Sequence, residues 1–189
     1  MIAGTDPCVA ELQGIHGAFA FPERLLQKIW LRGDFDRAAA RLVDGRALRI
    51  LFPGRWNLLG GPDFRQARLR FGTGVDAPVF TGDVELHLHA ADWDAHGHAR
   101  DPAYNDVGLH VVLFPPPPGS VTVGAGGNRI PVLALLPLLH RGLEEFAADE
   151  AVEQMAGRVL ALHQRLAAQS PEVAGVFDAE ISAAVVSRS

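Results

Sequence analysis

The chain lacks the features that define several classes of protein. Its 189 residues include one cysteine, Cys8, which excludes a disulfide framework and a cysteine-rich zinc finger. Lysine is also scarce, since Lys28 is the only one in the chain. No apolar run is long enough to cross a bilayer, and the N-terminus lacks the basic start and apolar stretch of a signal peptide. These absences predict a cytoplasmic protein with no membrane partner.

The composition is that of an ordinary globular protein, with 48% hydrophobic and 21% charged residues. The formal charge of −5 is not typical of a protein that coats nucleic acid. Arginine is nevertheless concentrated between residues 41 and 71, where seven arginines stand against two acidic residues. Either the chain simply uses arginine in place of lysine, or this segment forms a patch that contacts phosphates.

The spacing of apolar residues predicts the main helices and strands. Residues 22–42 have helical spacing, which Gly33 interrupts. Strands are predicted over 47–52, 67–71, 79–89 and 107–114, and a hairpin over 121–123 and 130–135. Helical spacing returns after residue 137, and Ser170-Pro171-Glu172 is typical of the start of a further helix.

This order of elements predicts an α+β or α/β single domain with a central mixed sheet flanked by helices. We expect an N-terminal segment over residues 1–19 and a core over residues 20–136. Residues 137–189 are expected to form C-terminal helices packed on that core, where they offer a surface for a second copy or another protein partner.

Reactive side chains are densest along the predicted strand 79–89. Side chains alternate between the two faces of a strand, so Val84, Leu86 and Leu88 share one face. The opposite face carries Asp83, Glu85, His87 and His89. That face is either a polar surface in contact with water or a functional site. Two carboxylates and two imidazoles in a row favour the site.

A further carboxylate, Asp63, stands before the preceding predicted strand. The layout of Asp63, Glu85 and His87 resembles that of the PD-(D/E)XK nuclease superfamily. Two carboxylates from adjacent strands bind a hard ion such as Mg²⁺ or Mn²⁺, and the third residue orients the attacking water. The resemblance implies a nuclease-like fold, with Asp63 and Glu85 as metal ligands and all three residues as catalytic.

The sequence departs from that layout at one position, because His87 stands where the superfamily usually has lysine. An imidazole can act as a general base near neutral pH, or it can bind a metal. Lys28 and Glu23 on the first predicted helix are accessory candidates, since some superfamily members place the lysine on another element and many add an acidic helix residue. For both residues, composition favours the interpretation of an ordinary solvent-facing helix residue. The other accessory candidates are Asp83, His89, His96 and His98.

Histidine is concentrated in the same region, with five of the eight histidines between residues 87 and 110. This density opens a second hypothesis, in which His87, His89 and either His96 or His98 bind a transition metal such as Zn²⁺. A third hypothesis is a non-catalytic module that binds nucleic acid or a protein partner through a degenerate site. Candidate phosphate contacts in the first and third cases are Arg55, Arg65, Arg68 and Arg70.

Linked motifs across the centre of the chain resemble a bacterial family known only as domain of unknown function 2851. They are Trp56-Asn57, Gly61-Pro62-Asp63-Phe64, Gly82-Asp83-Val84-Glu85-Leu86-His87, Asp92-Trp93, His96-Gly97-His98, Tyr104-Asn105-Asp106-Val107 and Leu109-His110-Val111-Val112. The resemblance covers roughly residues 20–136. It implies no particular activity, so the nuclease hypothesis depends on Asp63, Glu85 and His87 alone.

Overall fold

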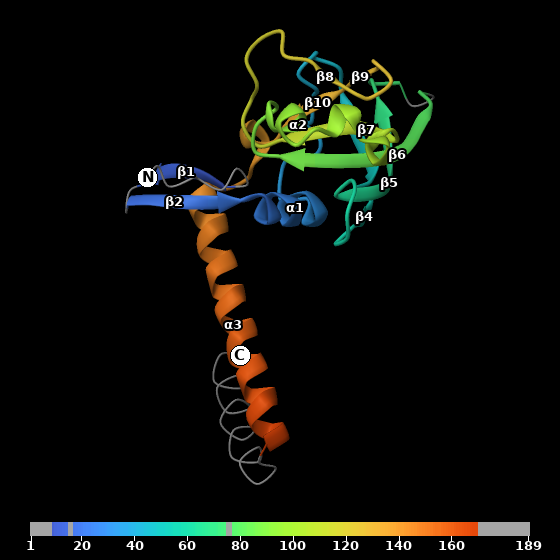
Figure 1. Ribbon diagram of the computed structural model, residues 1–189. Helices are drawn as coiled ribbons and strands as arrows, with labels where there is room; N and C mark the ends of the chain where they lie inside the picture. The colour runs from blue at the N-terminus through green and yellow to red at the C-terminus, as the bar shows by residue number, and fades with distance from the viewer. Residues whose placement is uncertain (1–8, 15–16, 75–76, 170–189) are drawn as a thin grey trace, which may run out of the picture. The chain divides into compact units, whose positions relative to one another are not determined.

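A computed structural model describes residues 9–14, 17–74 and 77–169 of the chain (Figure 1). The chain divides between Leu143 and Glu144 into two compact units. Cys8 and the helix start predicted at residues 170–172 lie outside the described residues.

The first unit is built on a mixed sheet with the strand order β10-β7-β6-β5-β3, and β4 pairs with β5 beside this path. The strands are β3 (Leu48–Phe52), β4 (Arg55–Trp56), β5 (Phe64–Phe71), β6 (Val79–His87), β7 (Val107–Val112) and β10 (Val132–Ala134). Neighbours are antiparallel from β3 to β6, whereas β6, β7 and β10 run parallel. With the helices described below, this arrangement confirms the predicted α+β class and its mixed sheet.

The parallel pair β6 and β7 requires a connection that crosses from one end of the sheet to the other. Three short helical segments make this crossover: α2 (Asp92–Ala95), η1 (His98–Arg100) and η2 (Pro102–Tyr104). The crossover therefore brings the histidine-rich segment back toward the strand that precedes it.

Helix α1 (Glu23–Arg32) follows strand β2 and buries Leu25, Leu26, Ile29 and Trp30 as one stripe. The prediction of a helix to residue 42 is wrong beyond Gly33. Gly33 adopts φ +72°, and its N–H donates to the Ile29 carbonyl, which ends the helix in a left-handed cap. The Trp30 indole donates to the Pro53 carbonyl at 3.0 Å and ties α1 to the loop after β3.

Two small hairpins complete the first unit, β1 (Val9–Gly14) with β2 (Gly17–Pro22), and β8 (Thr122–Val123) with β9 (Arg129–Ile130). The second hairpin confirms the predicted one, although its second arm is shorter than expected. After Pro131 the chain leaves β8 and pairs with β7 as β10. Proline has no N–H to donate, which explains the change of partner at this position. The turn η3 (Leu136–Leu138) follows.

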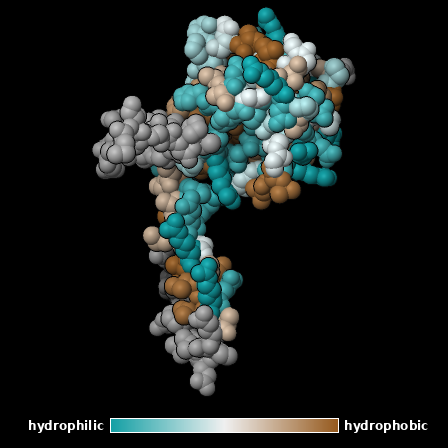
Figure 2. Space-filling model, viewed as in Figure 1, coloured by the Kyte–Doolittle hydropathy of each residue, from teal (hydrophilic) through white to brown (hydrophobic). Residues whose placement is uncertain are grey.

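The second unit contains α3 (Leu143–Gln169), which confirms the predicted helical C-terminal part. Val152, Met155, Val159, Leu162 and Leu166 recur along it at heptad spacing, with exposed fractions of 41–69%. Figure 2 shows apolar side chains at the surface of this helix. Among the described helices, none is long and apolar enough to cross a membrane.

A carboxylate and histidine cluster on strand β6

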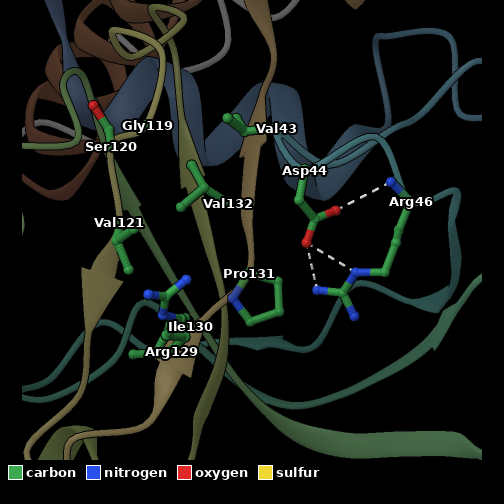
Figure 3. Close-up of a pocket in the computed structure, with 10 residues that line it drawn as sticks. All are labelled: Val43, Asp44, Arg46, Gly119, Ser120, Val121, Arg129, Ile130, Pro131 and Val132. Carbon is green, nitrogen blue, oxygen red and sulfur yellow. Dashed lines mark hydrogen bonds and ion pairs between the residues drawn. The ribbon is translucent and has the colours of Figure 1, made fainter.

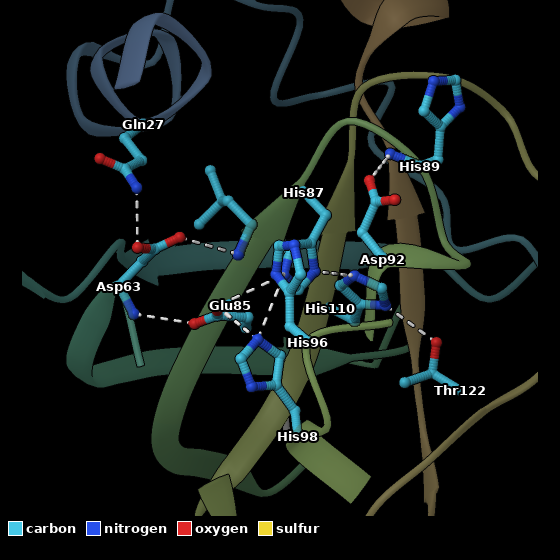
Figure 4. A network of polar contacts seen from close by, with 11 residues as sticks. Gln27, Asp63, Glu85, His87, His89, Asp92, His96, His98, His110 and Thr122 are labelled. Atoms are coloured by element: carbon cyan, nitrogen blue, oxygen red, sulfur yellow. Dashed lines mark hydrogen bonds and ion pairs between the residues drawn. The ribbon is translucent and has the colours of Figure 1, made fainter. Parts of the chain in front are cut away.

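Both faces of strand β6 are buried near its end. Val84 and Leu86 are inaccessible on the apolar face, as alternation predicts. On the other face Glu85 is 5% exposed and His87 is 1% exposed. A water-exposed polar face is therefore excluded, because side chains from α1, β5 and the crossover lie over it (Figure 4).

His89 does not belong to this buried face. The strand ends at His87, two residues before its predicted end, so the alternation that would align His89 with Glu85 no longer applies. The His89 ring is exposed and stacks on Phe114 at 4.8 Å between centroids. Its backbone N–H donates to Asp92 Oδ2 at 2.8 Å.

Asp63 and Glu85 lie together, as the antiparallel pairing of β5 with β6 predicts. Phe64 pairs with Val84, which places the residue before Phe64 beside the residue after Val84. The Asp63 N–H donates to Glu85 Oε2 at 2.9 Å, and the Leu86 N–H donates to Asp63 Oδ2 at 3.1 Å. Two carboxyl groups that are distant in sequence thus lie side by side, with Asp63 half-buried and Glu85 buried.

Gln27 and Trp56 hold Asp63 from the side of helix α1. Gln27 Nε2 donates to Asp63 Oδ1 at 2.7 Å, and Trp56 Nε1 donates to Gln27 Oε1 at 3.2 Å. The indole donor fixes which end of the Gln27 amide faces the carboxylate. Sequence reasoning missed Gln27, although its place one helical turn after Glu23 could have indicated a shared face.

Glu23 on α1 is a third carboxyl group near Asp63 and Glu85, and the three residues form the carboxylate group. Glu23 Oε1 is buried and has no hydrogen-bond partner among the described residues. Burial, then the nearby charges of Asp63, Asp92 and Glu85, raise the pKa of Glu23 to about 8. Burial likewise raises the pKa of Asp63 to about 7 and that of Glu85 to about 8. Burial and the neighbouring negative charges therefore disfavour ionisation of these carboxyl groups, and a bound cation would favour it.

Lys28 lies elsewhere on α1. It is five positions after Glu23, about 140° around the helix, and so does not share the face formed by Glu23 and Gln27. Asp83 is buried, and its Oδ1 accepts from the Gln66 N–H at 3.0 Å. Gln66 has φ +59° at an irregular step of β5, so Asp83 stabilises that bulge.

His87 is at the centre of a histidine group. Its Nε2 lies 3.0 Å from His96 Nδ1, 3.3 Å from His98 Nε2 and 3.6 Å from Glu85 Oε1. His98 Nε2 lies 3.4 Å from the same Glu85 oxygen. Gly97, with φ +78°, stands between His96 and His98 and turns the chain at the end of α2. Glu85 therefore belongs to both the carboxylate group and the histidine group.

A second row of side chains supports His87 from β7 and β8. His87 Nδ1 lies 2.9 Å from His110 Nε2, and His110 Nδ1 lies 2.8 Å from Thr122 Oγ1. Burial is the main cause that lowers the pKa of His87 to about 2 and that of His110 to about 3. Both rings are consequently neutral at pH 7. Nothing in the sequence singled out Thr122, which becomes adjacent only through the β8–β9 hairpin.

Aromatic rings enclose His98. It stacks on Tyr104 with 3.8 Å between centroids, and Trp93 lies edge-on at 5.3 Å. The Trp93 indole donates to the Val123 carbonyl at 3.0 Å, which fixes this wall to β8. The motif residues Trp93 and Tyr104 therefore position a histidine.

The four candidate phosphate-binding arginines lie on strands β4 and β5. Arg55 and Arg65 are exposed and pair across the two strands. Arg68 pairs with Thr81 and Arg70 with Val79, so both share the sheet face of Glu85. At about 3.3 Å per residue, they lie roughly 13 to 20 Å from Glu85 along β6. Arg68 is exposed, whereas the buried Arg70 Nε has no hydrogen-bond partner among the described residues.

A separate pocket of about 460 Å³ lies between the β8–β9 hairpin and the turn near residue 44 (Figure 3). Asp44 and Arg46 line it and form an ion pair at 2.6 Å. No residue predicted to act in catalysis or phosphate binding lines this pocket, so the β6 cluster is the candidate site.

Fold and cluster together define an α+β protein with a buried acidic and imidazole centre. The chain belongs to the DUF2851 family, described as a protein of unknown function, whose model matches residues 23–155. No curated protein and no solved structure matches the chain.

Proposed function

We propose that the protein is a metal-dependent phosphodiesterase that hydrolyses a P–O bond of a nucleic acid. The observation that carries the proposal is the group formed by Glu23, Asp63 and Glu85, in which two half-buried carboxyl groups lie beside the buried Glu85. A buried acidic group of this kind is costly unless a cation compensates it.

The ligand atoms of this group fit a hard divalent ion. Mg²⁺ and Mn²⁺ prefer carboxylate oxygens, and Glu23 Oε1 is an oxygen that lacks any other described partner. When bound there, such an ion supplies stabilisation of charge on the phosphate and lowers the pKa of a bound water. Gln27 and the Leu86 N–H each donate to one oxygen of Asp63, so they would hold this carboxylate in place when it binds an ion.

The surrounding residues suit a polyanionic substrate. Arg65 is exposed two positions after Asp63, and Arg55 is opposite it on β4. Arginine contacts phosphate through a planar fork of donors, and under this proposal the pair binds the phosphate next to the reacting one. Arg68 and Arg70 lie further along the same face and would contact more distant phosphates.

The test begins with calorimetric titration of Mn²⁺ and Mg²⁺ into the wild type, Asp63→Asn and Glu85→Gln. The matched control is Asp44→Asn, since Asp44 is exposed and forms its ion pair with Arg46, away from the cluster. We expect both site variants to lose Mn²⁺ binding while the control retains it. Circular dichroism of each variant checks the fold.

Hydrolysis is then measured on single-stranded and double-stranded DNA and RNA with Mn²⁺ present. Cleavage by the wild type that Asp63→Asn abolishes supports the enzyme. A folded wild type that binds Mn²⁺ and nucleic acid yet cleaves none of these substrates contradicts the proposal. That result would favour a non-catalytic module, in which Asp63→Asn leaves nucleic-acid binding intact.

A further inference from the structure

The His87 ring has more polar neighbours than its nitrogen atoms can satisfy. An imidazole nitrogen holds either one proton or one lone pair, so it makes one hydrogen bond. His87 Nε2 nevertheless faces His96 Nδ1 at 3.0 Å and His98 Nε2 at 3.3 Å, with Glu85 Oε1 at 3.6 Å. His87 Nε2 can therefore satisfy only one of these three neighbours, unless a further atom stands among them.

Most of these separations match those of ligands around one metal ion. With metal–nitrogen distances of about 2.0–2.1 Å, adjacent ligand atoms of a tetrahedral site lie about 3.3 Å apart. Four of the six pairs among His87 Nε2, His96 Nδ1, His98 Nε2 and Glu85 Oε1 are 3.0 to 3.6 Å apart. All three nitrogens lie within 4.8 Å of one another. Because His96 is exposed at the end of α2, its ring can turn to complete the set.

We infer that His87 Nε2, His96 Nδ1, His98 Nε2 and Glu85 Oε1 form a second metal site, which takes a transition ion with the ligand preferences of Zn²⁺. Three imidazoles favour such an ion over Mg²⁺, whose preferred ligands are oxygens. The site lies beside the carboxylate group and shares Glu85 with it, because Glu85 Oε2 accepts from the Asp63 N–H.

The contacts behind His87 favour a metal at its Nε2. If His87 Nδ1–H donates to His110 Nε2, then His110 Nδ1–H donates to Thr122 Oγ1. This arrangement satisfies both rings as neutral species and leaves a lone pair on His87 Nε2, directed at the other three ligands. Metal-binding histidines ordinarily have such a support on their second nitrogen.

The second site does not rest on the proposed function, because its three nitrogen ligands are not part of the carboxylate group, although Glu85 is common to both. Only its catalytic role depends on that proposal. Two ions that share Glu85 would form a two-metal centre, in which one ion stabilises the attacking oxygen and the other the leaving oxygen.

The experiment titrates Zn²⁺ and Co²⁺ into the full chain, after removal of bound metal, and follows the visible absorption of Co²⁺ and the heat of Zn²⁺ binding. The variants are His96→Ala and His98→Ala. His89→Ala is the matched control, because His89 is also an exposed histidine near the end of β6 but lies outside the cluster. Mn²⁺ titration of the same proteins reports on the carboxylate group separately.

We expect one Zn²⁺ per chain beyond any ion at the carboxylates, bound at least about tenfold more weakly by His96→Ala and His98→Ala. His89→Ala should bind Zn²⁺ as the wild type does, and Asp63→Asn should retain Zn²⁺ while it loses Mn²⁺. The inference is overturned if the folded wild type binds no Zn²⁺, or if His96→Ala binds it with unchanged affinity. His96 is exposed, so the His96→Ala result does not depend on whether His98→Ala folds.

The two proposals fail in distinguishable ways. If the histidine variants lose Zn²⁺ binding and the wild type cleaves no nucleic acid, the second site is supported and the proposed activity is contradicted. If the wild type cleaves nucleic acid with Mn²⁺ alone, His96→Ala cleaves it equally well and neither protein binds Zn²⁺, the activity is supported and the second site is contradicted.

Discussion

The polar face of β6 has two halves that the fold assembles differently. The carboxylate half depends on adjacent antiparallel strands, so the register of β5 on β6 alone brings Asp63 to Glu85. The histidine half depends on a crossover of short helical segments, which returns His96 and His98 to His87. The first half follows from sheet geometry, whereas the second depends on loop conformation. Glu85 is common to both halves, so a substitution can affect the two halves together or one of them alone.

The largest effect is expected for Glu85→Gln. The carboxylate reaches Asp63 through Oε2 and His98 through Oε1, so one substitution removes a ligand from each half. We expect Mn²⁺ and Zn²⁺ affinities to fall together, each about a hundredfold or more, as measured by calorimetry. Retention of Zn²⁺ binding would show that the halves are separate sites.

A pH dependence of stability is expected from the carboxylate half. The pKa values of Glu23, Asp63 and Glu85 are raised to between about 7 and 8, so the folded protein retains protons that the unfolded chain has lost. The free energy of unfolding should therefore fall as pH rises, by up to about 1.4 kcal/mol per pH unit for each proton.

The histidine half acts in the opposite sense at lower pH. His87 and His110 have lowered pKa values, so stability increases with pH up to their ordinary value near 6.5. Above pH 6.5 the carboxylates dominate, and denaturant unfolding of the metal-free protein should show declining stability to about pH 8. Saturating Mn²⁺ should remove the decline. A metal-free protein with constant stability from pH 6.5 to 8 would contradict this view of the acidic group.

A smaller effect, limited to Mn²⁺ binding at the carboxylate half, is expected for Gln27→Leu. This change removes the donor to Asp63 Oδ1 and leaves the Trp56 indole without its acceptor. Loss of such a support typically weakens metal binding about 10- to 100-fold. Calorimetry should show weaker Mn²⁺ binding and unchanged Zn²⁺ binding. Equal losses for both ions would point to a general disturbance of the fold instead.

The smallest effect is expected for Thr122→Val, which removes a supporting contact in the histidine half as Gln27→Leu does in the carboxylate half. The hydroxyl that contacts His110 Nδ1 is lost while the shape of the side chain is retained. Leaving a buried polar group unsatisfied costs about 1–3 kcal/mol, and only part of this reaches His87 through His110. We expect Zn²⁺ affinity to fall by less than about tenfold with Mn²⁺ affinity unchanged. A fall in Mn²⁺ affinity alone would contradict the division into two halves.

Sequence reasoning predicted the elements that depend on local patterns. Alternation identified β6 and its two faces, and the apolar stripe of α1 identified the helix that carries Glu23. The proximity of Asp63 and Glu85 was predictable because antiparallel neighbours share a register. The catalytic roles of Asp63, Glu85 and His87 stay predictions.

Other features depend on long-range packing and were not predictable in this way. The helix end at Gly33 is a backbone conformation that the longer apolar pattern obscured. The burial of Glu85 and His87 results from the crossover, and an alternating strand is equally typical of a wet surface. Gln27 and Thr122 acquire their roles only when α1 and the β8–β9 hairpin pack against the sheet.

The crossover between β6 and β7 also affects the order in which parts of the molecule fold. Antiparallel neighbours such as β5 and β6 meet early, since little chain must be closed to join them, whereas a parallel pair is slower to form. The oxygen ligands are thus expected to gather before the nitrogen ligands. An ion bound by His87, His96 and His98 would then link the crossover, which folds late, to strand β6, which folds early. The amides of α2 and η1 should therefore exchange their hydrogens more slowly when Zn²⁺ is bound.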